Sequence, residues 1–362
     1  MADILDYIDW RGDVPFSVSP FNEVDGYIIA KIGTPDFTGI VPEDGENVSV
    51  GAAIAGYAAK YGDIQDNLGV LTSKTLAPVL NRLPETARYA DLRLSGYAAS
   101  FSSEVPEQFS ALTVILPDET KVVTFRGTDD TLVAWKEDCL IAVERVIPAQ
   151  DDAERYLLRA AEMYDGPLMV AGHSKGGNLA VYAAARMPEE IQERIVAVYN
   201  YDGPGFKPDF LQSIGYMRIM DKVHTILPKY SIVGTLLTQD STMNCVESDS
   251  FGIASHDGFT WNTCSTGFVR CEELSRSSRV IDESMDYILA KMTRDECREF
   301  INDLFDILSS AGAVTVTDLT EQRLTDAAAI AGTLRKNPTM RKFASGLIRQ
   351  ILREYRESIT GG

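Results

Sequence analysis

The stretch VAGHSKGGN, residues 170–178, decides which fold the chain is expected to adopt. It contains the pattern G-x-S-x-G, preceded by a short apolar run typical of a buried strand and followed by an alanine-rich run typical of a helix. In this context the serine is forced into a strained backbone conformation, so the residues two positions away must be small, as Gly172 and Gly176 are. We therefore predict that Ser174 is a nucleophile held above the edge of a sheet. A close-packed glycine turn is the alternative, whereas the phosphate-loop pattern G-x-x-x-x-G-K-[ST] is absent.

The sequence on either side of this turn has the pattern of an α/β protein. A helix is predicted at 19–33, with Ser19 as its cap and Gly33 at its end, and another at 48–61; three β-rich runs follow between 92 and 126. Strands then alternate with helices, which implies a mainly parallel central sheet covered on both faces. The elements predicted in this part are helices at 131–146, 149–164, 176–187 and 209–214, and strands at 167–172, 195–201 and 222–227.

The C-terminal part of the chain has a different pattern. After about Leu274 strand signals nearly vanish, and apolar residues recur with helical spacing. We therefore expect an α/β domain at 1–274 and a helical extension at 275–362, packed on or beside it. The apolar helix faces need a partner, which is either the core or a second copy in a homo-oligomer. The helices predicted here are 278–292, 294–309, 319–334 and 340–355.

Charge and composition narrow the choice of partners and compartment. The 362 residues include 34 basic and 53 acidic ones, a formal net charge of −19, which repels nucleic acid and anionic membrane surfaces. The N-terminus MADILDYIDWRGDVPF is acidic where a signal peptide needs basic residues, and no run approaches the roughly 18 apolar residues of a membrane span. We expect a cytoplasmic protein without a nucleic-acid partner or a transmembrane segment.

The cysteines support the same compartment. There are five of them, an odd number, scattered along the chain and without a C-x-x-C pair. We therefore expect reduced thiols, and neither a disulfide framework nor a zinc site. The five are Cys139, Cys245, Cys264, Cys271 and Cys297.

A nucleophilic serine needs a base, and the chain offers only three histidines. His173 adjoins Ser174 and cannot easily fold back onto it, and His224 lies in a predicted strand, so structural roles are expected for both. His256 lies in SHDGFTW, a polar turn after the last core strands. Catalytic groups of this kind lie on loops beyond strand ends, and in this fold the histidine comes last along the chain. His256 is the predicted base.

The acid that would orient this base has several candidates. Asp202 directly follows the buried run IVAVYNY, so its carboxylate can reach a histidine across the sheet edge. It also stands in a tight turn with glycines and a proline, where an aspartate is at home for structural reasons. Asp221 and Asp240 flank the next strand, and Asp257 adjoins the histidine but is poorly placed to orient it. We favour Asp202 and leave the others open.

An oxyanion intermediate would need two hydrogen-bond donors. The first is expected to be the backbone N–H of Lys175, the residue after the nucleophile. The second is expected from an earlier strand end, where the segment TFRGTDD, residues 124–130, leaves a β-rich run. Gly127 permits an unusual backbone path there, and Thr128 offers both its N–H and its hydroxyl. Taken alone, this segment is only a polar turn.

Together these motifs resemble a known family. F-R-G-T, then W-x-x-D at Trp135 and Asp138, then G-H-S-x-G-G, is similar to the class 3 lipases of the α/β-hydrolase superfamily. The resemblance implies an α/β-hydrolase fold, an oxyanion role for Thr128 and a lid near 132–135. The sequence is also similar to a bacterial family of lipase-like proteins, over roughly residues 19–265. The motifs shared with that family are F-N-E-x-D (21–25), D-G-P-G-F (202–206), S-I-V-G (231–234) and H-D-x-x-x-W (256–261).

Two departures from the class 3 pattern bear on the site. Lys175 stands where leucine is usual, and its charge is expected either to favour an anionic head group or to point into solvent. The family's D-x-V-P acid has no counterpart as such, because that place reads Thr225-Ile226-Leu227-Pro228. This second departure favours Asp202 as the acid.

We therefore expect a serine esterase that cleaves lipid-like carboxyl esters. Ser174 would attack the carbonyl carbon, His256 would carry the proton and Asp202 would orient the imidazole, with no metal or organic cofactor. An acyltransferase or thioesterase is the alternative within the enzymes, and a catalytically silent scaffold with a partner-binding helical tail is the alternative outside them.

Overall fold

The computed structural model of the chain describes residues 2–64, 73–129, 131–239, 243–276, 278–279 and 293–310. Its centre is an eight-stranded sheet in which the strands follow one another in chain order. The pairings from β1 to β4 are antiparallel and those from β4 to β8 are parallel. The strands are β1 (Asn47–Ser49), β2 (Arg93–Ser102), β3 (Glu107–Ile115), β4 (Lys121–Phe125), β5 (Leu168–His173), β6 (Ile195–Tyr201), β7 (Val223–Pro228) and β8 (Asn244–Val246).

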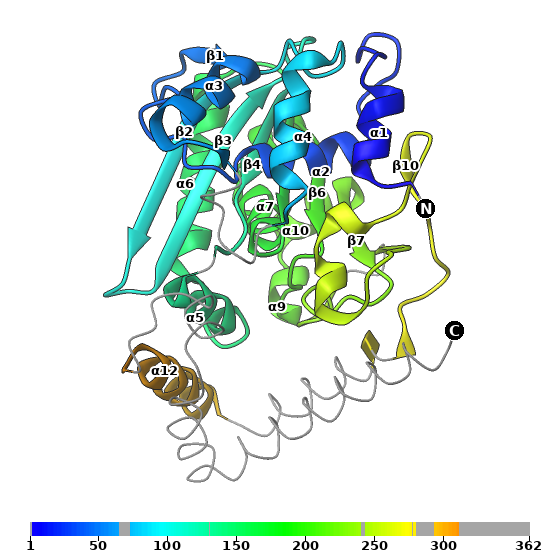
Figure 1. Cartoon of the computed structure of the whole chain (residues 1–362). Coiled ribbons are helices and arrows are strands. Elements are labelled where there is room, and N and C mark those ends of the chain that lie inside the picture. The colour runs from blue at the N-terminus through cyan, green and yellow to red at the C-terminus, as the bar shows by residue number, and fades with distance from the viewer. Residues whose placement is uncertain are drawn as a thin grey trace.

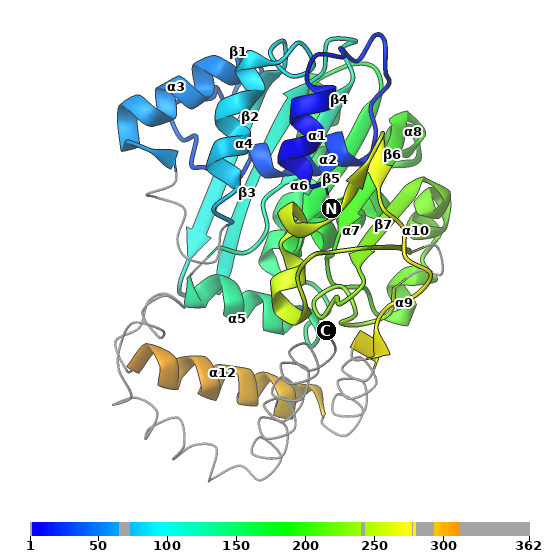
Figure 2. The same ribbon diagram turned by 45° about the vertical axis from the view of Figure 1, so that its right-hand side comes forward.

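Helices cover both faces of this sheet, each over its own hydrophobic core (Figures 1 and 2). One face carries α1 (Ile4–Arg11), α2 (Glu23–Ile32), α3 (Val50–Tyr61) and α4 (Leu76–Arg82). The other carries α6 (Pro148–Met163), α7 (Lys175–Arg186), α8 (Glu189–Arg194) and α10 (Ile214–Ile219), with the short α9 (Pro208–Leu211) beside them. Parallel strands buried on both faces need such double cover. The architecture is that of an α/β-hydrolase, as the sequence predicted.

The start of α2 differs from the prediction. We expected Ser19 to cap a helix from residue 19, but α2 begins at Glu23 because the Asn22 side chain accepts hydrogen bonds from the backbone N–H groups of Val24 and Asp25. The hydroxyl of Ser19 instead accepts a hydrogen bond from Arg11. Residues 209–214, expected as one helix, are divided between the end of α9 and the start of α10.

The described part of the C-terminal region contains α12 (Arg294–Ser310), which packs against α5 (Leu132–Ile141). Arg294 and Arg298 of α12 both donate to the carboxylate of Glu144, just after α5, and these bonds lower the pKa of Glu144 to about 2. The predicted helices at 319–334 and 340–355, and most of 278–292, lie outside the described residues, and the domain boundary at 274 stays a prediction. No helix within the described ranges is long and apolar enough to cross a bilayer.

The N-terminal segment is tied to the domain by a buried ion pair. Asp25 and Arg88 are both fully buried, and their carboxylate and guanidinium groups approach to 2.5 Å. Asp25 also accepts hydrogen bonds from the hydroxyl groups of Tyr7 and Tyr89 and from the backbone N–H of Asn22. The acidic residue of the F-N-E-x-D motif therefore has a structural role, because a buried carboxylate needs all of these partners.

Replacing Arg88 by methionine should lower the free energy of unfolding by about 3–5 kcal/mol, because it leaves Asp25 buried without its counter-charge. Arg93→Met is the matched control, since Arg93 pairs with Glu119 at the surface and its loss should cost less than about 1 kcal/mol. Urea unfolding followed by circular dichroism measures both. Equal losses in the two variants would contradict the structural role assigned to Asp25.

The expectation of reduced thiols is wrong for two cysteines. Cys245 in β8 and Cys271 form a disulfide, with their Cα atoms 5.2 Å apart, while Cys139, Cys264 and Cys297 are free. The two partners are 26 residues apart along the chain, so no short cysteine motif marked them. They meet because the segment after the small hairpin β9 (Thr263–Cys264) and β10 (Gly267–Phe268) pairs back along β8: Cys271 N–H donates to Cys245 O.

Protein purified without reductant and then denatured should bind iodoacetamide at three cysteines, and at five after reduction. Intact mass spectrometry counts the added groups. In a Cys245→Ser variant all four remaining thiols should react without reduction. Five modified cysteines in the unreduced wild type would contradict the pairing.

Candidate active site

Ser174 occupies a strained turn between β5 and α7. Its backbone has φ 60° and ψ −132°, a conformation that residues with a side chain rarely adopt. The turn depends on glycine on both sides: a Cβ atom on Gly172 would collide with the carbonyl of Gly176, and one on Gly176 with the carbonyl of Phe125. The amide of Ser174 donates to Tyr201 O at 2.9 Å, which fixes the turn to the end of β6. Both glycines are therefore required, as the motif predicted.

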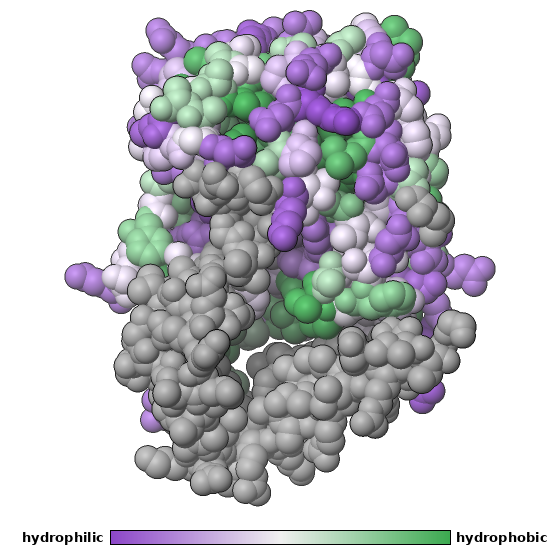
Figure 3. Space-filling view, viewed as in Figure 1, coloured by the Kyte–Doolittle hydropathy of each residue, from purple (hydrophilic) through white to green (hydrophobic). Residues whose placement is uncertain are grey.

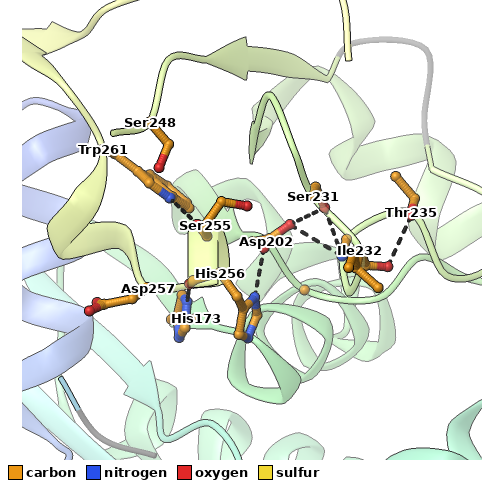
Figure 4. Close-up of polar contacts among 12 residues, drawn as sticks. His173, Asp202, Ser231, Ile232, Thr235, Ser248, Ser255, His256, Asp257 and Trp261 are labelled. Carbon is orange, nitrogen blue, oxygen red and sulfur yellow. Dashed lines mark hydrogen bonds and ion pairs between the residues drawn. The ribbon is translucent and has the colours of Figure 1, made fainter. Parts of the chain in front are cut away.

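His256 and Asp202 lie next to each other (Figure 4). His256 Nδ1 is 2.6 Å from Asp202 Oδ2, across 54 residues of sequence. Asp202 is fully buried, whereas the His256 side chain keeps one fifth of its surface exposed and lines the same pocket as Ser174. Among the described residues neither Ser174 Oγ nor His256 Nε2 has a hydrogen-bond partner, so both atoms are available to a bound substrate. Contacts between a nucleophile and its base are commonly long before substrate binds.

Asp202 is held by more than the histidine. Its second carboxylate oxygen accepts hydrogen bonds from Ser231 Oγ at 2.5 Å and from Gly234 N–H at 3.2 Å. Its own amide donates to Ile226 O of β7, and its backbone adopts a left-handed conformation with φ 49°. Ser231 was missed as a site residue in the sequence, although Ser231 and Gly234 are the ends of the S-I-V-G motif. That motif therefore fixes the carboxylate.

The loop that carries His256 is anchored from two directions. Trp261 is fully buried, and its indole N–H donates to Ser255 O at 2.7 Å. His173 Nε2 lies 2.7 Å from His256 O, and Lys31 Nζ lies 3.5 Å from His173 Nδ1. The imidazole of His173 therefore donates to the loop with one nitrogen and faces the lysine with the other. Burial, and then the charge of Lys31, lower the pKa of His173 well below its usual value.

The remaining candidates lie elsewhere. Asp221 is exposed at the start of β7, the opposite end of that strand from Pro228. Asp257 lines the pocket, but its carboxylate accepts the backbone N–H of Phe259. His224 is exposed near the start of β7, where its ring stacks on that of Tyr199 in β6. Asp240 lies outside the described residues.

The segment expected to supply the second oxyanion donor packs against the nucleophile. A Cβ atom on Gly127 would come within 2.6 Å of His173 O, so only glycine permits this approach. The Thr128 hydroxyl donates to the carboxylate of Asp138, which corrects the expectation that this hydroxyl is free for an oxyanion. The Thr128 amide has no acceptor among the described residues, and the Lys175 amide, in the first position of α7, has none within its helix.

The side chain of Lys175 corrects a second expectation. It neither points into solvent nor faces the pocket: it is fully buried, and its Nζ lies 2.9 Å from Glu137 Oε2 of α5. The nearby Asp138 keeps a quarter of its side chain exposed, and its partial burial raises the pKa of its carboxyl to about 6 against the opposing charge of Lys175. A head group in the pocket therefore does not meet the Lys175 ammonium.

A pocket of about 440 Å³ opens over Ser174 and His256. Its polar lining includes Lys31 near the end of α2 and Arg126 just after β4. Its apolar lining includes Pro204 and Leu236, from the loops that follow β6 and β7. α5 borders it through Trp135, Asp138 and Cys139. Apolar side chains also gather on the lower part of the described surface (Figure 3). Ile253, an exposed apolar residue, is part of the pocket lining. The pocket therefore offers both polar and apolar walls.

A family model described as Mbeg1-like matches residues 83–306, more than half of the chain. The chain belongs to the Mbeg1-like family. A search of the curated proteins finds no match.

Solved lipase structures are similar to this Mbeg1-like chain at low identity. The crystal structure of M37 lipase matches with a TM-score of 0.37 and 13% identity, over 66% of this chain and 78% of that one. A triacylglycerol lipase from Penicillium expansum matches with a TM-score of 0.33 and 12% identity, over 52% and 77%. The Rhizomucor miehei lipase in its propeptide complex matches with 0.31 and 13%, over 72% and 90%.

The site of this Mbeg1-like protein contains no evident metal centre: within the described ranges, no three or more His, Cys, Asp or Glu side chains cluster closely enough to hold an ion. Of the predicted site residues, Ser174, His256 and Thr128 line one pocket. Asp202 is buried behind it against His256, and Lys175 follows Ser174 as the first residue of α7. Their catalytic roles stay predictions.

Replacing His173 by phenylalanine should make the free energy of unfolding depend less on pH in the acidic range. The pKa of His173 is lowered in the folded state, so the folded protein keeps this histidine neutral. Above about pH 6.5 the unfolded chain also has it neutral, and the stability is unaffected. As the pH falls below that value, only the unfolded chain binds the proton, so the free energy of unfolding decreases. Between pH 7.5 and 5.5 the wild type should lose about 1 kcal/mol more than the variant. Urea unfolding at the two pH values measures this difference, and equal losses would show that His173 is not held neutral.

Proposed function

We propose that this Mbeg1-like protein is a serine hydrolase that cleaves carboxyl esters through an acyl-enzyme. The observation that carries the proposal is the 2.6 Å contact of His256 Nδ1 with the buried Asp202, beside a serine on a strained strand-to-helix turn. A buried carboxylate that binds one imidazole nitrogen fixes the tautomer in which the other nitrogen accepts a proton. Because His256 lines the pocket, its other nitrogen can accept that proton from Ser174 beside a bound substrate.

The mechanism follows from these positions. Ser174 Oγ attacks the ester carbonyl carbon and gives its proton to His256 Nε2. The amides of Thr128 and Lys175 stabilise the negative oxygen of the tetrahedral intermediate. The carbon–oxygen bond then breaks, the alcohol leaves with the proton from His256, and a water molecule repeats the sequence to release the acid and restore Ser174. These steps need no metal or organic cofactor.

The substrate class we propose is a lipid-like ester. The pocket has apolar walls at Trp135, Pro204, Val233 and Leu236, which suit an acyl chain. Its volume of about 440 Å³ admits a medium-sized molecule. α5, which lies where the class 3 resemblance places a lid, borders the opening. We also propose the narrower kinship with bacterial lipase-like proteins. The proposal of a cytoplasmic location rests on the acidic N-terminal sequence alone, because the Cys245–Cys271 disulfide removes the support that reduced thiols would have given.

A fluorophosphonate probe should label the wild type and leave Ser174→Ala and His256→Ala unlabelled. Asp202→Asn should react more slowly by a factor on the order of 10³–10⁴, because the histidine then loses its tautomer. His224→Ala is the matched control for loss of a histidine and should label at the wild-type rate, since His224 stacks on Tyr199 away from the pocket. In-gel fluorescence over time measures the rates.

Absence of labelling in folded wild-type protein, with detergent present to displace a closed lid, would contradict the proposal and favour a silent scaffold. Labelling that persists in Ser174→Ala would place the nucleophile elsewhere. If labelling behaves as expected, p-nitrophenyl esters of increasing chain length define the acyl preference. Turnover that rises with an added alcohol acceptor would instead identify an acyltransferase.

A further inference from the structure

The Lys175 side chain makes a complete set of buried contacts behind the nucleophile turn. Its Nζ donates to Gln108 O at 2.8 Å, Gln108 Oε1 at 3.0 Å and Glu137 Oε2 at 2.9 Å. These are all three of the hydrogen bonds that an ammonium group can donate. A cation in the protein interior is retained only with such full compensation.

Glu137 is satisfied with equal completeness. Besides Lys175, its Oε2 accepts the backbone N–H of Gln108 at 3.1 Å, and its Oε1 accepts that of Ala149 at 3.1 Å. Both members of the ion pair have no exposed surface. The pair therefore joins the start of α7, the middle of α5, the start of β3 and the start of α6 at a single point.

Both expected oxyanion donors depend on this point. Lys175 supplies one of them with its own backbone amide, and its side chain makes the buried contacts. The other is Thr128, whose hydroxyl is bound by Asp138, the neighbour of Glu137 on α5. Lys175 Nζ is 3.9 Å from Asp138 Oδ1, and its charge favours the ionised form that accepts this hydroxyl. The position of α5 thus sets the position of Thr128.

Stability alone does not explain a charged pair at this place. Buried ion pairs contribute little compared with apolar side chains of the same size, because removing two charges from water costs about as much as their attraction returns. The leucine usual at this position in the class 3 pattern would fill the space without that cost. A fully hydrogen-bonded pair instead fixes how the elements that it joins are placed relative to one another.

We propose that the Lys175 side chain is a positioning residue: through Glu137 and Asp138 it holds α5 and Thr128 in register with the nucleophile turn, so that both amides face one oxyanion. The inference rests on the proposed hydrolase function for its catalytic consequence. Its structural part, the attachment of α5 to the turn, stands independently of activity.

The test replaces the whole pair with Lys175→Met/Glu137→Leu, which leaves no lone buried charge. Lys121→Met is the matched control, because Lys121 is another buried lysine, at the far end of β4, bonded to Asp165 O. Fluorophosphonate labelling measured over a range of probe concentrations separates the maximal labelling rate from the concentration giving half that rate. Hydrogen–deuterium exchange of 132–141 reports on α5. If the double variant does not fold, Glu137→Gln, which keeps size and one acceptor oxygen, takes its place with a smaller expected effect.

We expect the maximal labelling rate of the double variant to fall about 10- to 100-fold, with the half-rate concentration unchanged and faster exchange in α5 than in Lys121→Met. An unchanged maximal rate beside a labelled wild type would overturn the inference and leave the hydrolase proposal intact. A wild type that does not label would reject the hydrolase proposal. The exchange of α5 then decides the positioning claim by itself, since equal exchange in the double variant and the control overturns it.

Discussion

The backbone turn at Ser174 is the constraint around which the rest of the domain is arranged. Its conformation is available only because Gly172 and Gly176 let three pieces of backbone approach more closely than any side chain allows. β5 and α7 are fixed to each other by that turn, and the hydrogen bond from Ser174 to Tyr201 O fixes β6 as well. The parallel strands then deliver Thr128, Ser174 and Asp202 to the same edge of the sheet, each just past a strand end.

Several short motifs that are far apart along the chain fix the loops around this turn. S-I-V-G holds the Asp202 carboxylate, and the tryptophan of H-D-x-x-x-W anchors the loop of His256. In D-G-P-G-F, the carbonyls of Pro204 and Gly205 accept the side-chain amide of Asn178 from α7, which secures the loop after Asp202. In each of these motifs, hydrogen bonds that involve a side chain hold a loop beside the turn.

The sequence was sufficient for the sheet, the turn and the residues that surround the pocket, because each depends on local patterns: an apolar run, a glycine spacing, a histidine on a polar loop. It was insufficient where distant segments meet. Lys175 looked like a pocket or surface charge, since nothing near it in sequence reveals Glu137, and the pairing of Cys245 with Cys271 depends on the path of an entire hairpin. The sequence also contained no sign that the Thr128 hydroxyl donates to Asp138, which lies ten residues further along the chain.

The most direct test of the account is a crystal structure of the protein carrying a covalent phosphonate. The account predicts phosphorus on Ser174 Oγ, the phosphonyl oxygen within hydrogen-bond distance of the amides of Thr128 and Lys175, and His256 still bound to Asp202. A phosphonyl oxygen directed away from both amides, or an imidazole detached from Asp202, would contradict the site as described.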